Sequence, residues 1–167
     1  MIWVYLKRKR TENFIHYNRE IVGPGWIAHD MANALIQEDV GVYGVASGHY
    51  SSTKKFSEEF SIKHVYENYQ AMFKDGNIDI VYNATPHNSH YEIMKDALLH
   101  NKHVFSEKAI IINSDELEEC VEIVKERHLA ISDGVTLFIC LYLKRKKSNF
   151  IQLFRSSEDG SSKFWEL

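Results

Sequence analysis

Apolar residues along this chain follow two patterns that alternate. Two short stretches, 40–46 and 78–84, are almost continuously apolar, as strands buried on both faces of a sheet are. In other stretches apolar residues recur every three or four positions, as at Ile27, Met31 and Leu35, which is typical of an amphipathic helix. The alternation of strands with helices predicts a parallel sheet that is covered by helices on both faces.

The same patterns place each element. We expect a first strand that ends at Ile21-Val22 and further strands over 40–46, 63–66, 78–84, 103–106 and 129–132. We expect helices over 26–37, 52–60, 69–75, 89–100 and from Ser114 onward, with Gly76 ending the third and with Ser89 and Ser114 as N-caps. The predicted fold class is α/β, a Rossmann-type doubly wound parallel sheet, in which ligands bind at the carboxyl ends of the strands.

Composition limits the classes of partner. The 167 residues suffice for one domain with a hydrophobic core, and the net charge of −3 gives no case for nucleic acid. Basic runs at 7–10 and 144–147 lack interleaved aromatic residues, so we interpret them as solvated tails. Cys120 and Cys140 form neither a disulfide framework nor a zinc pattern, so no metal site is expected. No stretch has the length of a membrane span or a signal sequence, and we expect a cytoplasmic protein.

A glycine pair stands between the first strand and the first helix. Gly23 permits a tight turn, and Gly25 lets the backbone approach a pyrophosphate, which then lies on the helix N-terminus. Ala28 takes the third position of this dinucleotide-binding fingerprint, where alanine is tolerated. An ordinary turn is the alternative interpretation, but the position after an apolar strand favours a nucleotide site.

The end of the second strand, Ser47-Gly48-His49, leaves the choice of cofactor open. Dinucleotide folds use an acidic residue here to bind the adenosine ribose of NAD, or an arginine to accept the 2′-phosphate of NADP. This chain has neither, and Lys54 and Lys55, which follow on a helix, are expected to face solvent. NAD and NADP are therefore both candidate cofactors.

Polar residues follow two further predicted strands. Thr85, Asn88 and His90 come after the first, where a polar loop with a helix cap would explain them without a ligand. Glu107 and Lys108 come after the second, where charges are unusual unless they are paired. A partly desolvated lysine could transfer a proton or bind a substrate hydroxyl, and a surface ion pair is the alternative.

Three runs in register resemble the Gfo/Idh/MocA family of NAD(P)-dependent oxidoreductases, which includes glucose–fructose oxidoreductase and inositol dehydrogenase. The runs are Gly23 to Ala28, Asp79 to His87 and Asn101 to Lys108, and the similarity extends from about Ile21 to about Phe138. The resemblance implies an N-terminal Rossmann domain, followed in the family by an α/β domain that supplies substrate contacts and the oligomer interface. It also implies hydride transfer between NAD(P) and the hydroxyl carbon of a sugar or polyol.

The resemblance also assigns residues to the site. Those expected at the pyrophosphate turn are Gly23, Gly25, Trp26 and Ile27, and those expected at the adenosine ribose are Ser47 and Gly48. Those expected on the nicotinamide side are Thr85, Pro86, Asn88 and His90. Glu107 and Lys108 match the family's Glu-Lys-Pro motif, whose lysine contacts both substrate and cofactor. Lys108 is therefore the expected catalytic residue.

Three departures from the family pattern stand out. Ala109 replaces the proline of the Glu-Lys-Pro motif, so the peptide after Lys108 is expected to lose its rigid geometry. Gly48 stands where the family has an arginine. Polar residues up to Glu20 stand where a buried parallel strand should be apolar, so residues 1–20 are candidates for sequence foreign to the family.

We therefore expect three segments. They are an atypical extension over 1–13, an NAD(P)-binding Rossmann domain over 14–138, and a tail over 139–167 that is not family sequence. The tail reads like out-of-frame translation after a frameshift, and a short helix over 141–154 packed on the sheet is the alternative. The second domain is then absent, and the sheet edge it leaves exposed would promote self-association.

Without a second domain we expect dinucleotide binding with negligible turnover of the sugar or polyol. Proximity and orientation supply much of an enzyme's rate, and half of the substrate pocket would be missing. Three alternatives stay open: a stand-alone nucleotide-binding or regulatory module, a subunit completed by a separate chain, and a degenerate remnant without function.

Overall fold

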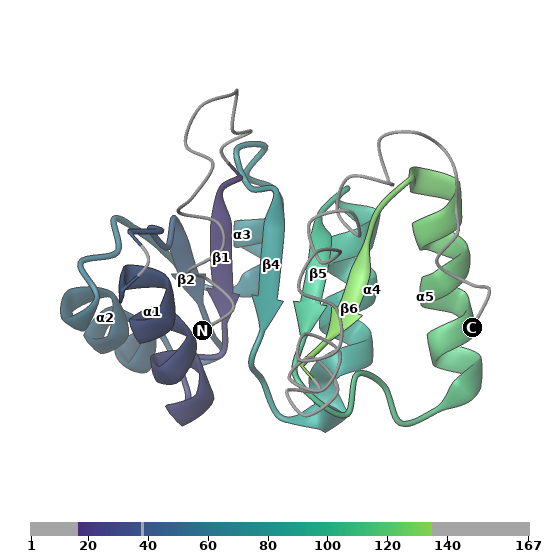
Figure 1. Cartoon of the computed structure of the whole chain (residues 1–167), viewed down its shortest axis with the longest axis horizontal. Coiled ribbons are helices and arrows are strands. Elements are labelled where there is room, and N and C mark those ends of the chain that lie inside the picture. The colour runs from purple at the N-terminus through teal and green to yellow at the C-terminus, as the bar shows by residue number, and fades with distance from the viewer. Residues whose placement is uncertain (1–16, 38, 135–167) are drawn as a thin grey trace, which may run out of the picture.

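A six-stranded parallel sheet forms the centre of the molecule (Figure 1). The computed structural model describes residues 17–37 and 39–134. The strands are β1 (Arg19–Val22), β2 (Gly44–Ala46), β3 (His64–Tyr66), β4 (Ile80–Asn83), β5 (His103–Ser106) and β6 (Ile131–Asp133). They lie in the order β3-β2-β1-β4-β5-β6, so the chain reverses its winding direction between β1 and β4.

Helices cover both faces of this sheet. They are α1 (Trp26–Gln37), α2 (Tyr50–Glu59), α3 (Tyr69–Phe73), α4 (His90–Leu99) and α5 (Ser114–Arg127), with a short 3₁₀ turn, η2 (His87–Ser89), before α4. Successive residues of β1 point to opposite faces, and Ile21 packs with α1 and α2 while Val22 packs with α3, α4 and α5. The predicted doubly wound α/β fold is therefore confirmed.

The element boundaries differ from the sequence-based ones in instructive places. Helix α5 is capped by Asn113, whose side chain accepts a hydrogen bond from the backbone of Asp115, and Ser114 is already helical. The side chain of Ser89 makes no capping hydrogen bond, because η2 leads directly into α4. Helix α3 ends at Phe73, before Gly76. The strand expected over 40–46 is limited to Gly44–Ala46.

Glu20 lies fully buried in the middle of β1, where the sequence argued for an apolar residue. Gly44, its neighbour on β2, leaves the room for it, since a Cβ atom on Gly44 would lie 2.6 Å from Glu20 Oε1. Neither carboxylate oxygen has a hydrogen-bond partner among the described residues. Burial raises the pKa of Glu20 to about 8, against the smaller opposing influences of the nearby Tyr66 hydroxyl and the Lys102 ammonium. The suspicion that everything up to residue 20 is foreign to the fold is thus wrong for 19 and 20, which form sheet.

Other expectations fall on residues that the structure does not describe. The basic runs, Cys140 and the segments 1–13 and 139–167, including the alternative helix over 141–154, all lie there. Cys120 is described, and it is a buried residue of α5 with the pKa of its thiol raised to about 11 by burial, as expected of a packing cysteine. Among the described helices, none is long and apolar enough to cross a membrane.

The first prediction concerns the pH dependence of stability. Because burial raises the pKa of Glu20 from 4.5 to about 8, the folded chain binds a proton that the unfolded chain releases between these values. The stability that this proton confers is present below pH 4.5 and is lost as the pH rises towards 8. We expect Glu20→Gln to flatten this decline, by roughly 3 kcal/mol between pH 5 and pH 8.5.

Urea unfolding of the full chain at several pH values measures this effect. Glu58→Gln is the matched control, since Glu58 is exposed on α2. Parallel pH profiles for the parent chain and Glu20→Gln would show that Glu20 does not take up the proton.

Candidate functional site

The turn between β1 and α1 is built around Gly23. Its φ of +87° lies in the left-handed region, and its backbone N–H donates to the Ala46 carbonyl oxygen at 3.0 Å. A Cβ atom here would lie 2.8 Å from Thr85 Cγ2 and 3.1 Å from the Ala84 carbonyl carbon. Both the backbone angle and the close approach to the β4 loop therefore require glycine.

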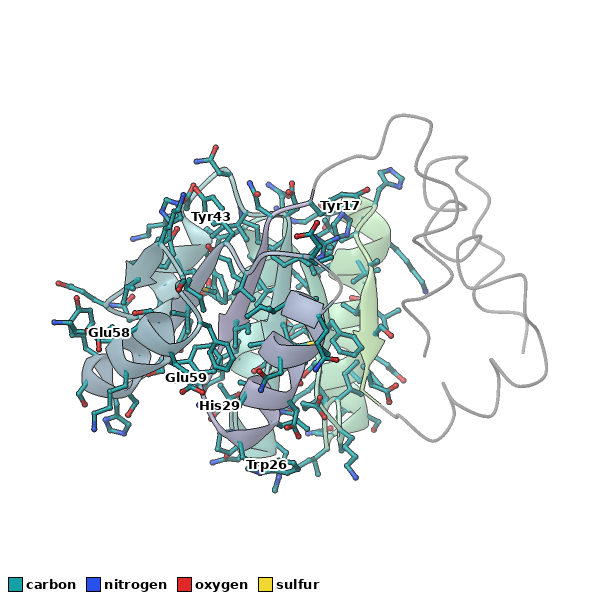
Figure 2. All side chains as sticks on the ribbon, turned by 60° about the vertical axis from the view of Figure 1, so that its left-hand side comes forward. Tyr17, Trp26, His29, Tyr43, Glu58 and Glu59 are labelled. Carbon is teal, nitrogen blue, oxygen red and sulfur yellow. The ribbon has the colours of Figure 1, made fainter. Side chains whose placement is uncertain are left out.

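Gly25 and the first turn of α1 form the part of this turn that is open to a ligand. Gly25 is exposed, and a Cβ atom built on it would have no other atom within 4 Å. Trp26 begins α1 at the same edge of the molecule and is 77% exposed (Figure 2). The first turn carries no acidic side chain to oppose an anion at its backbone N–H groups. These features fit a pyrophosphate.

Ser47, expected at the adenosine ribose, uses its hydroxyl to shape its own turn. The hydroxyl oxygen accepts from the His49 backbone N–H at 3.0 Å and lies 2.7 Å from Thr53 Oγ1. Ser47 is buried, whereas Gly48 and His49 are exposed. The side chain of Ser47 thus holds the β2–α2 connection, and a ribose contact by Ser47 and Gly48 stays a prediction.

A pocket of about 280 Å³ lies between the glycine turn and α2. Its lining residues are Pro24, His29, Ser52, Lys55, Phe56 and Glu59. His29 Nε2 and Glu59 Oε2 approach to 3.3 Å across one side of it (Figure 2). Lys54 and Lys55 are exposed, as expected. No acidic residue occurs between 47 and 57, directly after β2, and the carboxylate that lines this pocket is that of Glu59, on α2.

Asn83, at the carboxyl end of β4, organises the loop that follows. It is fully buried, and its Oδ1 accepts from the hydroxyl and the backbone N–H of Thr85 at 2.7 and 3.3 Å. Its Nδ2 atom has no partner among the described residues. Asn83 is not among the site residues predicted from the sequence, although its polar side chain inside the apolar run 78–84 could have indicated a role there. Pro86 and Asn88 are exposed beyond it.

His90 is buried at the start of α4. It is 1% exposed, Nδ1 lies 2.7 Å from the Ala109 carbonyl oxygen, and Nε2 lies 2.8 Å from the Thr85 carbonyl oxygen. Both ring nitrogens are therefore occupied by backbone. A place for His90 on the nicotinamide side stays a prediction.

Glu107 and Lys108 separate after β5 instead of forming a pair. The Tyr82 hydroxyl donates to Glu107 Oε1 at 2.5 Å, and the carboxylate lies against Gly134. Burial and this carboxylate together raise the pKa of Tyr82. Lys108 is exposed, so the expected desolvation of its amine is not found. The Lys108–Ala109 peptide bond is cis.

These pieces meet at the carboxyl edge of the sheet. The glycine turn touches the loop after β4, and His90 joins that loop to the residue after Lys108. The junction lies between β1 and β4, where ligands bind in open α/β sheets. Among the described residues, no group of three His, Cys, Asp or Glu side chains could hold a metal.

Comparison with known proteins agrees with this geometry. Residues 18–135 match the profile of the Gfo/Idh/MocA family, described as an oxidoreductase family with an NAD-binding Rossmann fold. The chain belongs to this family. The recognition made from the three runs is thus confirmed, and the match includes the strand that contains Glu20.

Curated members of the Gfo/Idh/MocA family are much longer than the matched segment. The chain is 27% identical over 118 residues to trans-1,2-dihydrobenzene-1,2-diol dehydrogenase from Mus musculus, covering 69% of this chain and 35% of that protein. It is 34% identical over 92 residues to D-xylose 1-dehydrogenase (NADP(+)) from Hypocrea jecorina, covering 51% and 24%. The chain thus spans about a third or less of the length of these relatives.

Solved structures of Gfo/Idh/MocA-type proteins agree in fold. KijD10, a 3-ketoreductase from Actinomadura kijaniata solved with NADP and TDP-benzene, aligns with a TM-score of 0.67 at 28% identity, covering 71% of this chain and 37% of that one. Scyllo-inositol dehydrogenase from Lactobacillus casei, solved with NAD(H) and scyllo-inositol, aligns with a TM-score of 0.64 at 23% identity, covering 71% and 36%. The dinucleotides NAD and NADP are the cofactors of this family, as predicted.

The second prediction tests the glycine turn. We expect Gly23→Ala to lower the free energy of unfolding by roughly 1–3 kcal/mol, because the positive φ and the 2.8 Å approach to Thr85 both penalise a Cβ atom. Gly41→Ala is the control, since a Cβ atom there meets nothing within 4 Å. Urea unfolding measures both variants, and equal stability of the two would contradict the assigned constraint.

Proposed function

We propose that the segment 18–135 binds NAD(P) as the cofactor half of an oxidoreductase that acts on CH–OH groups of a sugar or polyol. The observation that carries the proposal is the glycine turn, in which Gly23 is required by its contacts while Gly25 is left open at the start of α1. Its place at the reversal between β1 and β4, within reach of the loop that carries Lys108, supports the same site.

The described residues would divide the work as follows. The turn at Gly25, with Trp26 and Ile27 on the first turn of α1, would hold the pyrophosphate through backbone N–H groups. A bound nicotinamide would supply the hydride chemistry. The exposed side chain of Lys108 would hydrogen-bond the substrate hydroxyl and, in its neutral amine form, accept the hydroxyl proton. Thr85, Pro86 and Asn88 would border the nicotinamide side, and Glu107 would support that edge through Tyr82.

We propose that this segment binds the dinucleotide without turning over substrate. The matched residues correspond to about a third of each long relative, so contacts on the far side of a substrate would have to come from elsewhere. Lys108 is exposed and so lacks the enclosed pocket in which proton transfer is efficient. The second candidate is a site that a separate chain completes. Turnover of a polyol with NAD(P), after this chain is added to a cell extract that contains the separate chain, would reveal it.

The third prediction is that Gly25→Val abolishes dinucleotide binding. Its isopropyl group would enter the space above the first turn of α1, where the pyrophosphate is proposed to lie. Titration of the full chain with NADH and NADPH, followed by nicotinamide fluorescence, measures the loss, which we expect to exceed about 100-fold in Kd.

Gly76→Val is the control for this titration, because Gly76 is equally exposed and open but lies outside the site. Saturable binding that survives in Gly25→Val would remove the pyrophosphate from this turn. A folded parent chain that binds neither nucleotide would refute the proposed function itself.

The fourth prediction is a preference for NADP over NAD. No residue from 47 to 57 supplies a carboxylate to bind the ribose diol, and Lys55 lines the pocket beside the glycine turn, where the Glu59 carboxylate is paired with His29. We expect Lys55→Gln to weaken NADPH binding about tenfold and NADH binding by less than about twofold.

Lys74 is an exposed lysine beside α3, and Lys74→Gln is the charge-matched control for Lys55→Gln. The same fluorescence titration separates the two nucleotides. Equal weakening of NADH and NADPH would show that Lys55 acts through general charge and does not read the 2′-phosphate.

A further inference from the structure

His90 stands between two loops that are far apart in sequence. It is the first residue of α4, and it is nearly inaccessible, with 1% of its surface exposed. One ring nitrogen meets the carbonyl oxygen of Thr85, five residues earlier, and the other meets that of Ala109, nineteen residues later. Both distances, 2.8 and 2.7 Å, are within hydrogen-bond range. Because a carbonyl oxygen only accepts, the ring makes both bonds at once only with a proton on each nitrogen.

The two residues that His90 contacts, Thr85 and Ala109, lie next to the two parts of the proposed site. Thr85 also packs its methyl group against Gly23, at the turn assigned to the pyrophosphate. Ala109 directly follows Lys108, the residue assigned to the substrate hydroxyl. A continuous path of contacts therefore runs from the glycine turn through Thr85 and His90 to the peptide beside the lysine.

Among the described residues, a second hydrogen bond joins the two loops on the other side of Lys108. There the Glu107 backbone N–H donates to the carbonyl oxygen of the buried Asn83 at 2.9 Å, while the Lys108 side chain is exposed. The Ala109 carbonyl oxygen, one residue after the lysine, is held by the imidazole alone in the described hydrogen bonds. The direction in which the lysine leaves the loop thus depends on a side chain of another element.

We propose that His90 is a positioning residue that fixes the Lys108 loop relative to the glycine turn by joining the Ala109 and Thr85 carbonyl oxygens. The role of Lys108 rests on the proposed function, but the tie between the loops does not. Both ring nitrogens face backbone carbonyl oxygens, so His90 acts on Lys108 through the loop. It sets where the lysine stands with respect to a bound dinucleotide.

The two ring nitrogens can be tested separately. An asparagine amide reaches about as far as Nδ1, and a glutamine amide reaches about as far as Nε2. His90→Asn therefore keeps a donor near the Ala109 carbonyl oxygen and loses the hydrogen bond to Thr85. His90→Gln keeps a donor near the Thr85 carbonyl oxygen and loses the hydrogen bond to Ala109. The variants remove one hydrogen bond each and are matched in polarity. His87→Asn, on the exposed η2 turn, is the control.

The experiment is hydrogen exchange of two backbone amides in the full chain without cofactor. The Glu107 amide, bonded to the Asn83 carbonyl oxygen, reports on the Lys108 loop, and the Ser89 amide, bonded to the Pro86 carbonyl oxygen, reports on the Thr85 loop. We expect His90→Gln to speed exchange at Glu107 about fivefold and His90→Asn to speed exchange at Ser89 about fivefold, each sparing the other amide.

This crossed pattern separates positioning from ordinary stabilisation. Equal acceleration at both amides in both variants would mean that His90 only fills the core, and would overturn the proposal. If a variant does not fold, the parent chain alone tests the proposal. The proposal requires that the His90 ring N–H of the parent chain exchange slowly with solvent, which a long-range ¹H–¹⁵N spectrum measures. A ring that exchanges at the rate of His87 would overturn it.

A second readout uses NADPH and modification of lysines by an amine-reactive acetylating reagent, read residue by residue by mass spectrometry. We expect NADPH to protect Lys108 at least about threefold in the parent and in His90→Asn, and not in His90→Gln, with Lys74 as the internal reference. Equal protection in both variants would count against positioning. Absence of NADPH binding in the parent would instead refute the proposed function and leave the exchange result standing.

Discussion

The close approach of the Gly23 turn to the backbone of Ala84 and Thr85 is the constraint on which the rest of the site depends. Because β1 lies between β2 and β4, its carboxyl end has strands on both sides, and a turn there must bend sharply to start α1 above the sheet. A φ of +87° provides the bend, and the missing Cβ atom lets the turn rest on the β4 loop. The same contact fixes Thr85, which brings His90 and then Ala109 into place.

Much of this fold could be predicted from the sequence, because the spacing of apolar residues records burial directly. The runs that end at Val22 and Ala84 and the helical stripe from Ile27 to Leu35 gave the correct layers. Glu20 could not be placed, since its burial depends on a gap opposite it at Gly44, on another strand. A single strand's pattern contains no information about its neighbours, so a buried carboxyl group reads as evidence against the strand.

The site was predictable at its glycines and less so at its polar residues. A glycine's role follows from the local backbone, which is why Gly23 and Gly25 could be assigned from their place after a strand. The direction of a polar side chain is set by partners far along the chain. The sequence around His90 does not indicate that the imidazole contacts Ala109. The sequence around Glu107 does not indicate that its carboxylate accepts a hydrogen bond from Tyr82. Family patterns mark such residues as important without saying whether they face the ligand or the backbone.

The destination of each hydrogen bond separates these two kinds of polar residue. Ser47 and Asn83 direct their hydrogen bonds to the turns that follow them, and His90 directs its bonds to two loops of the same chain. All three are buried, so their contribution is to hold the carboxyl edge in shape. Gly25 and Lys108 are exposed at that edge, and a ligand can reach them. A rigid rim of buried polar groups beneath a few accessible ones is the arrangement that preorganised binding requires, because the accessible groups then lose little freedom when the ligand arrives.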